Sequence, residues 1–120
     1  MERANRQSLE VQSSAQLDLG VERLAEVCER YGVRTLKVFG SFARGEATEK
    51  SDIDLLVTFV RPVGFFKLVA LERELSRLLG RRVDLVTEGA LSPYIRDKVM
   101  KAARVVWSDG RWEGLGVAFP

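Results

Sequence analysis

Two aspartates in an apolar run are the residues of this sequence best suited to chemistry. Asp52 and Asp54 are two residues apart at the start of DIDLLVTFV, residues 52–60, and Ser51 is expected to cap the turn at Asp52. Because side chains alternate along a strand, both carboxylates would project from one face, with Cα atoms roughly 6.5–7 Å apart. Two like charges at the start of a core strand are costly unless a cation offsets them. The pair is therefore compatible with a divalent-metal site, but an isolated D-x-D is more often a turn residue followed by an exposed strand edge.

A third aspartate, Asp84, lies within the short apolar run RVDLVT at 82–87. A neighbouring strand could place it beside the first two and complete a three-carboxylate site. Oxygen ligands alone suit Mg²⁺ or Mn²⁺ better than zinc, and Mg²⁺ is usually shared between a few carboxylates and substrate phosphates. The expected ligand is then a nucleoside triphosphate. The alternative is a solvent-facing position, or an ion pair with Arg81 or Arg82.

A glycine–serine turn at Gly40 and Ser41 breaks the apolar run before the aspartates. Glycine permits a close backbone approach, and the N–H groups at a helix start attract phosphate. Such a turn is more often structural than phosphate-binding, so it gains weight only beside the aspartates. Arg44 could pair with a phosphate through its planar guanidinium, or with Glu46 or Glu49 in an ion pair.

Taken together, these residues form the string GSFARG at 40–45, a spacer, and SDIDL at 51–55. The string resembles the signature of the DNA polymerase beta-like nucleotidyltransferase superfamily, and more closely that of its minimal nucleotidyltransferases. The resemblance extends over about residues 20–107 and includes VDLV around Asp84. It implies an α/β (α+β) nucleotidyltransferase fold in a single domain.

The resemblance also implies a role for each matching residue. Gly40 and Ser41 would hold the β- and γ-phosphates, and Asp52 and Asp54 would bind two Mg²⁺ ions. Asp84 would hold the second ion and help to deprotonate the acceptor hydroxyl. In-line attack on the α-phosphorus would then expel pyrophosphate, with the metals stabilising the attacking and leaving oxygens.

A protein acceptor is a further implication of the resemblance. Minimal nucleotidyltransferases are commonly encoded beside a small helical HEPN protein, as an antitoxin that adenylylates a hydroxyl of the toxin. The expected donor is ATP, and the expected acceptor is such a HEPN partner. One alternative is a nucleotide-binding antitoxin that acts by complex formation alone. Another is transfer to a small molecule, as in aminoglycoside nucleotidyltransferases.

Composition bounds these hypotheses. The chain has 120 residues, a hydrophobic share of 46% and a formal net charge of +2, which indicate one globular domain and give no argument from charge for a nucleic-acid partner. No apolar run is long enough to span a bilayer and no signal peptide is evident, so we expect a cytoplasmic location. Histidine is absent, so catalysis would proceed without imidazole. The single cysteine, Cys28, is expected in the core.

Hydrophobic periodicity predicts the elements that must position the site. Strands are predicted at 33–39, 52–60, 82–87 and 104–107. Helices are predicted from Asp18 as N-cap to Gly32, from Ser41 to Arg44, at 65–79, and from Pro93 with Ser92 as N-cap. Ile95, Val99 and Ala103 are expected to form the buried side of the last helix. This order predicts a mixed sheet of about four strands with helices packed against it.

The domain limits follow from the same reading. Residues 1–16 are predicted to be a loose N-terminal arm, residues 17–107 the nucleotidyltransferase domain, and residues 108–120 an apolar C-terminal tail. The tail could dock a partner or a second copy of the chain as a homo-oligomer, or it could fold back on its own surface.

Overall fold

The computed structural model describes the backbone of residues 13–114 and the side chains of residues 22–114. Its elements are α2 (Ser13–Arg30), β1 (Val33–Phe39), α3 (Ser41–Arg44), β2 (Ile53–Phe59), α4 (Phe65–Leu79), β3 (Val83–Thr87), a 3₁₀ turn (Glu88–Ala90), α5 (Pro93–Ala102), β4 (Arg104–Ser108) and β5 (Arg111–Trp112). Five strands form one mixed sheet in the order β3-β2-β1-β4-β5. Among them, β2 and β3 pair in parallel, and the other neighbours pair antiparallel.

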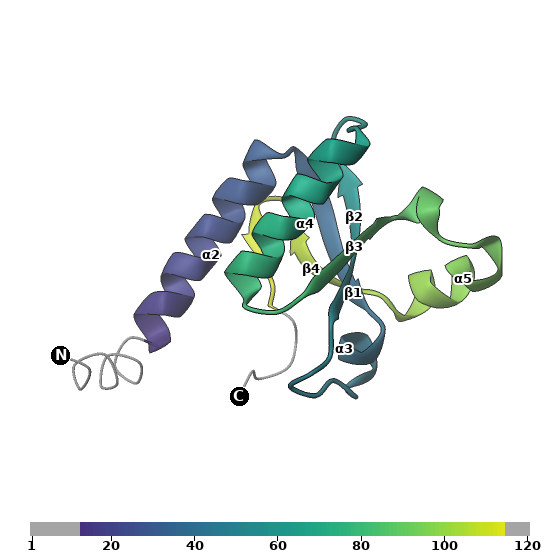
Figure 1. Ribbon diagram of the computed structural model, residues 1–120, viewed down its shortest axis with the longest axis horizontal. Coiled ribbons are helices and arrows are strands. Elements are labelled where there is room, and N and C mark those ends of the chain that lie inside the picture. The colour runs from purple at the N-terminus through teal and green to yellow at the C-terminus, as the bar shows by residue number, and fades with distance from the viewer. Residues whose placement is uncertain (1–12, 115–120) are drawn as a thin grey trace.

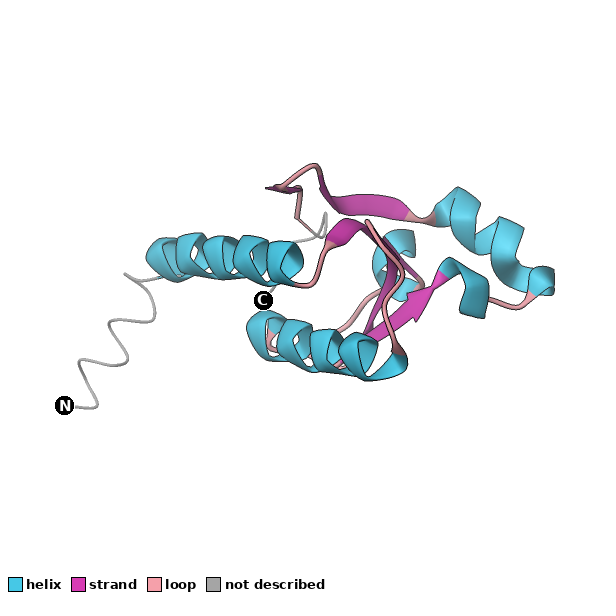
Figure 2. Cartoon of the chain, turned by 90° about the horizontal axis from the view of Figure 1, so that it is seen from above, coloured by secondary structure: helices cyan, strands magenta, loops and turns pink. Residues whose placement is uncertain are grey.

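The hydrophobic core lies between one face of this sheet and the helices α2 and α4, which lie side by side (Figure 1; Figure 2). Alternate residues of β2 point into it, among them Ile53 and Leu55, and Leu71 and Leu75 of α4 pack against them. Leu56 is also buried but is not part of this core, so the central strand is covered on both faces. Cys28 is buried in the same core, as expected.

The opposite face of the sheet carries α5, whereas α3 lies at the end of β1 and contributes Phe42 to the core (Figure 1). Ser92 caps α5 as predicted, accepting a hydrogen bond from the N–H of Tyr94 at 3.2 Å. The prediction that this helix has a buried side is wrong, because no residue of α5 is buried and Ile95 is 47% exposed. Val99 and Ala103 are only half-buried, because little of the apolar side of this helix is covered by the described part of the chain, and periodicity alone could not show that.

Two boundaries also differ from the prediction. The first helix begins at Ser13, so Asp18 lies inside it rather than at its N-cap, and residues 13–16 are helical rather than part of a loose arm. An aspartate inside a helix costs at most about 0.7 kcal/mol relative to alanine, which neighbouring turns can offset. The rest of the predicted arm, residues 1–12, lies outside the described residues.

The sheet has a fifth strand because the chain turns back after β4. Asp109 and Gly110 both have positive φ, at 52° and 79°, which is the conformation that Asp-Gly favours in a tight hairpin. The turn pairs Arg111–Trp112 with β4, and Trp112 packs against the core. This part of the predicted tail therefore folds back on the domain, while residues 115–120 lie outside the described part. Within that part, no helix combines the length and the apolar character needed to cross a bilayer.

Candidate active site

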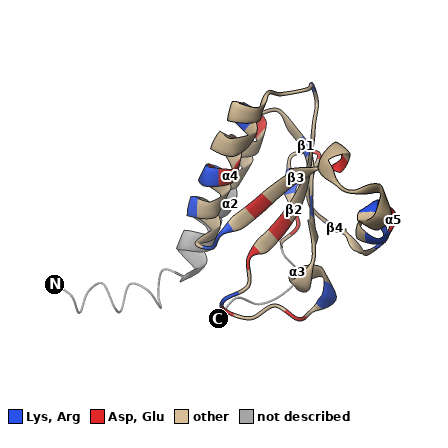
Figure 3. Ribbon diagram, turned by 45° about the vertical axis from the view of Figure 1, so that its right-hand side comes forward, with Lys and Arg blue, Asp and Glu red and all other residues tan. Residues whose placement is uncertain are grey.

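Asp54 and Asp84 are direct neighbours across the parallel strands β2 and β3. Adjacent strands lie about 4.8 Å apart and paired residues point to the same face, so the two carboxylates stand together. Asp52 comes one residue before β2 begins, and its charge acts on Asp54. The acidic segments of the two strands lie side by side in Figure 3. The structure thus brings the three predicted aspartates together, on the sheet face opposite α2 and α4.

Asp54 is the central carboxylate of this group. It is half-buried, whereas Asp52 and Asp84 are exposed. Its pKa is raised above the ordinary value, first by burial, then by the charge of Asp84 and then by that of Asp52, while Arg44 acts in the opposite sense. The ionised form of Asp54 is therefore held in an unfavourable field. A bound cation would relieve that field.

The glycine–serine turn lies against the same carboxylate. Phe39, the last residue of β1, is paired with Asp54, and Gly40 follows it with a φ of 69° and a ψ of −145°. A Cβ atom at Gly40 would overlap Oδ2 of Asp54. Glycine is required here for two reasons, because side chains rarely adopt this backbone conformation and because the carboxylate fills the space. Ser41 then begins α3, directly beside the acidic group.

Arg44 ends α3 and forms an ion pair with Glu46, with 3.0 Å between Nε and Oε1. Both side chains are exposed, so the pair is worth little and can exchange partners readily. The positive charge of Arg44 nevertheless reaches Asp54, whose pKa it lowers. Of the two readings of Arg44, the structure shows the ion pair and leaves the guanidinium within electrostatic range of the carboxylates.

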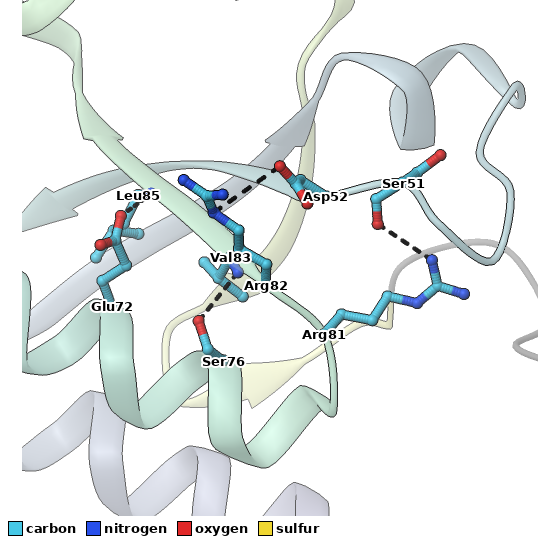
Figure 4. Close-up of polar contacts among 8 residues, drawn as sticks. All are labelled: Ser51, Asp52, Glu72, Ser76, Arg81, Arg82, Val83 and Leu85. Atoms are coloured by element: carbon cyan, nitrogen blue, oxygen red, sulfur yellow. Dashed lines mark hydrogen bonds and ion pairs between the residues drawn. The ribbon is translucent and has the colours of Figure 1, made fainter.

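The loop that leads into Asp52 is held by Arg81, which was not predicted to be a site residue. Arg81 donates from one Nη to the carbonyl oxygens of Thr48 and Ser51, at 2.6 Å and 3.2 Å. The Ser51 hydroxyl accepts a hydrogen bond from the N–H of Thr48 at 2.8 Å. It therefore caps the turn that precedes Asp52. Arg82 approaches Asp52 rather than Asp84, with 4.0 Å between Nε and Oδ2 (Figure 4).

Two polar side chains of α4 position the strand that carries Asp84. The N–H of Leu85 donates to Oε2 of Glu72 at 2.8 Å, and the N–H of Val83 donates to Oγ of Ser76 at 3.0 Å (Figure 4). Because β3 is an edge strand, these outward N–H groups have no strand to pair with. Glu72 and Ser76 seal that edge on both sides of Asp84. The signal in the sequence was two polar residues at i, i+4 spacing beside the leucine stripe of α4.

The donor set suits a hard cation that is shared with a phosphate-bearing substrate. Among the described residues, no group of three or more His, Cys, Asp or Glu side chains is arranged so that it could hold a metal ion by itself. Magnesium rarely uses such a group, because it binds through one or two carboxylates and takes its other ligands from water and substrate phosphates. At Gly40 the Asp54 carboxylate already fills the space that a Cβ atom would need. The acidic group and the glycine turn beside it are therefore a candidate site for a metal–nucleotide complex.

Comparison with known proteins supports this chemistry. The sequence model of the family described as nucleotidyltransferase domain matches residues 22–106. The protein adenylyltransferase MntA of Thermococcus cleftensis is 47% identical over 76 residues, which cover 63% of this chain and 77% of that protein. A solved structure provisionally described as a minimal nucleotidyltransferase is 38% identical with a TM-score of 0.56, covering 84% of this chain and 93% of that one. A complex of an AMPylated HEPN toxin with its MNT antitoxin, from Shewanella oneidensis, shares the fold at 19% identity with a TM-score of 0.55, covering 76% and 71%.

Proposed function

The chain belongs to the nucleotidyltransferase domain family, and we propose that it transfers AMP from ATP, with Mg²⁺, to a hydroxyl group on a partner protein. The observation that carries this proposal is the parallel register of Asp54 with Asp84, beside the Gly40 turn. Catalysis of phosphoryl or nucleotidyl transfer consists mainly of positioning and of neutralising charge, and this arrangement supplies both.

The residues present fit magnesium, and Asp52, Asp54 and Asp84 would hold it. When bound, the metal neutralises the charge on the triphosphate and stabilises the attacking and leaving oxygens. The N–H groups of the turn at Gly40 and Ser41 bind the β- and γ-phosphates and orient the α-phosphorus for in-line attack. The acceptor oxygen forms a bond to that phosphorus while the bond to the β-phosphate oxygen breaks, and pyrophosphate leaves.

The proton of the acceptor hydroxyl needs a base, and in the absence of histidine Asp84 is the group proposed for it. Its carboxylate is exposed on the open face of the sheet, where an incoming acceptor can reach it. Asp54 is half-buried between the turn and the strand and is suited to binding rather than to proton transfer. The two roles thus follow from the different exposure of the two carboxylates.

The partner proposed as acceptor is a small helical HEPN protein encoded beside this chain. MntA of T. cleftensis is named as a protein adenylyltransferase, and the S. oneidensis antitoxin was solved with an AMPylated HEPN toxin. Those activities are the relatives' own, and they support a protein acceptor for this chain. By analogy with these relatives, the chain would be the antitoxin and would act by modifying the toxin.

The test is a transfer assay with ATP labelled at the α-phosphate. The chain and Mg²⁺ are incubated with and without the neighbouring HEPN protein, beside the variants Asp52→Ala and Asp54→Ala. We expect label on the HEPN protein with wild type, at least 100-fold less with either variant, and none with a chelator.

A complementary sample with ATP labelled at the γ-phosphate separates transfer of AMP from transfer of phosphate. Transfer of AMP places only the α-label on the acceptor, whereas transfer of the terminal phosphate would place only the γ-label there. A stable complex without label on any protein, formed equally well by the variants, would instead establish an antitoxin that acts by complex formation.

A further inference from the structure

Helix α5 presents apolar side chains to solvent and buries none. Tyr94 is 94% exposed and Ile95 is 47% exposed, and Val105 of the adjoining strand β4 is 39% exposed. Large exposed side chains scattered singly are ordinary, but here they lie on one helix and on the strand that follows it. An aromatic residue at the first turn of an unpartnered helix is the type of anchor that dominates protein interfaces.

This helix lies on the same side of the sheet as the carboxylates. Residues of β2 that face the core alternate with Asp54, which therefore faces away from α2 and α4, toward the side that carries α5 (Figure 1). Arg104, two residues after α5 ends, is paired with Val38, and the next residue of β1 is paired with Asp54. The C-terminal end of α5 is thus joined to the carboxylate end of the sheet.

The distances allow one partner to cover both features. A helix of 10 residues is about 15 Å long, so Tyr94 lies roughly that far beyond the end of α5 nearest the carboxylates. A standard interface buries about 800 Å² on each partner, which corresponds to a patch roughly 30 Å across. The helix and the reacting centre therefore fit within the footprint of one docked protein.

The charge of the helix indicates the chemistry of that protein. α5 carries Arg96, Lys98 and Lys101 against the single acid Asp97. Tyr94, Lys98 and Lys101 are spaced i, i+4 and i+7, so they share one face of the helix, and Asp97 at i+3 belongs to the same face. With two lysines against one aspartate this face is basic, and it would attract an acidic surface that the three aspartates of the candidate site alone would repel.

We propose that α5 is the docking surface for the acceptor protein, with Tyr94 and Ile95 as apolar anchors and Lys98 and Lys101 as the contacts for an acidic patch around the acceptor hydroxyl. The proposal rests on the proposed function in one respect, which is that the occupant is the protein that receives the nucleotide. The docked partner brings its hydroxyl to the face on which Asp84 is exposed.

The test measures affinity, transfer and nucleotide binding separately, with the HEPN protein as the probe. The variants are Tyr94→Ala and the double charge reversal Lys98→Glu with Lys101→Glu. Matched controls lie on α4, on the far side of the sheet: Phe66→Ala, which removes a side chain that is 87% exposed, and Arg73→Glu with Arg77→Glu, which reverses an exposed basic pair one helical turn apart. Asp54→Asn serves as the variant that lacks transfer but keeps α5 intact.

We expect both α5 variants to weaken binding of the HEPN protein at least tenfold, to lower its labelling in proportion, and to leave binding of ATP with Mg²⁺ unchanged. The effect of the charge reversal should shrink as salt rises. Equal or larger losses in the α4 controls would overturn the proposal, as would wild-type affinity in the α5 variants. Loss of self-association alone, with partner affinity kept, would also overturn it by making α5 a contact between copies.

The outcomes separate this proposal from the proposed function. If wild type binds the HEPN protein through α5 but never labels it, the docking surface stands and the transfer proposal fails. If labelling proceeds unaltered in both α5 variants, transfer stands and the docking surface fails. Asp54→Asn is expected to bind the partner with unchanged affinity while labelling is lost.

Discussion

Oδ2 of Asp54 occupies the space that a Cβ atom at Gly40 would need, so the turn after β1 and the central carboxylate of β2 are fitted to each other. The antiparallel pairing of Phe39 with Asp54 creates this contact, because it brings the end of one strand against the beginning of the next. A substrate phosphate bound at the turn would therefore lie against the carboxylate that we propose as a metal ligand. The two halves of the sequence motif work as one structural unit.

Replacing Gly40 with alanine should damage both stability and transfer. Alanine must adopt a φ near 69° and displace the Asp54 carboxylate, so we expect a loss of about 1–3 kcal/mol in the free energy of unfolding and at least a tenfold loss of transfer. Gly45→Ala is the matched control, since its φ is also positive, at 74°, but nothing lies within 4 Å of the added Cβ. Denaturant unfolding and α-labelled ATP measure the two effects. Equal transfer losses in both variants would contradict the proposed contact.

Asp54 should make the metal-free protein less stable as pH rises. Its folded pKa is raised by burial and by Asp84 and Asp52, so between the ordinary value and the raised one the folded chain holds more protons than the unfolded chain. The contribution of Asp54 to stability is therefore fully present below the ordinary pKa and is lost as pH rises through the folded pKa.

Asp54→Asn removes this titration, so in a chelator its stability relative to wild type should be greater at pH 7 than at about pH 3. Thermal unfolding across that range provides the measurement, with Asp97→Asn on exposed α5 as the control. Mg²⁺ with ATP should stabilise wild type and not Asp54→Asn. A relative stability of Asp54→Asn that does not change with pH would show that the carboxylate is not electrostatically strained.

Glu72 and Ser76 should affect transfer although neither contacts the reacting atoms. Glu72→Ala or Ser76→Ala leaves a β3 N–H without its partner, at a cost of about 1–3 kcal/mol each, and loosens the strand that carries Asp84. We expect each variant to lower the rate of transfer roughly tenfold while the KM for ATP changes little. Arg73→Ala, exposed on the same helix, is the control. Unchanged rates at equal folded fraction would show that the edge contacts are structural only.

Cys28 should be inert in the folded protein. Burial, with a smaller contribution from Glu29, raises the pKa of its thiol to about 12, so only about one thiol in ten thousand is ionised at pH 8. A thiol reagent should react slowly with the native chain and rapidly in guanidinium. Cys28→Ala should leave transfer unchanged. Rapid modification of the native protein would show that α2 separates readily from the sheet.

Local patterns were enough to predict most elements and to single out the residues of the candidate site. The limits predicted for β1 and α4, and the Ser92 cap of α5, are those observed, because each depends on periodicity and on residues next to one another in the chain. The spacing of Asp52 and Asp54 on an apolar strand likewise depends only on the period of a strand. The Asp-Gly turn that creates β5 was also a local signal, although the predicted sheet did not include it.

What the sequence by itself determined is therefore the set of elements, the family resemblance and the identity of the three acidic residues. Tertiary structure alone decided that β3 lies beside β2 in the register that faces Asp84 with Asp54, and that Glu72 and Ser76 seal the edge of β3. It also decided that α5 has an uncovered apolar side. The reason is physical, because strand register and helix docking are set by contacts between segments that are distant in the chain. The energies of such contacts cannot be inferred from a local pattern of residues.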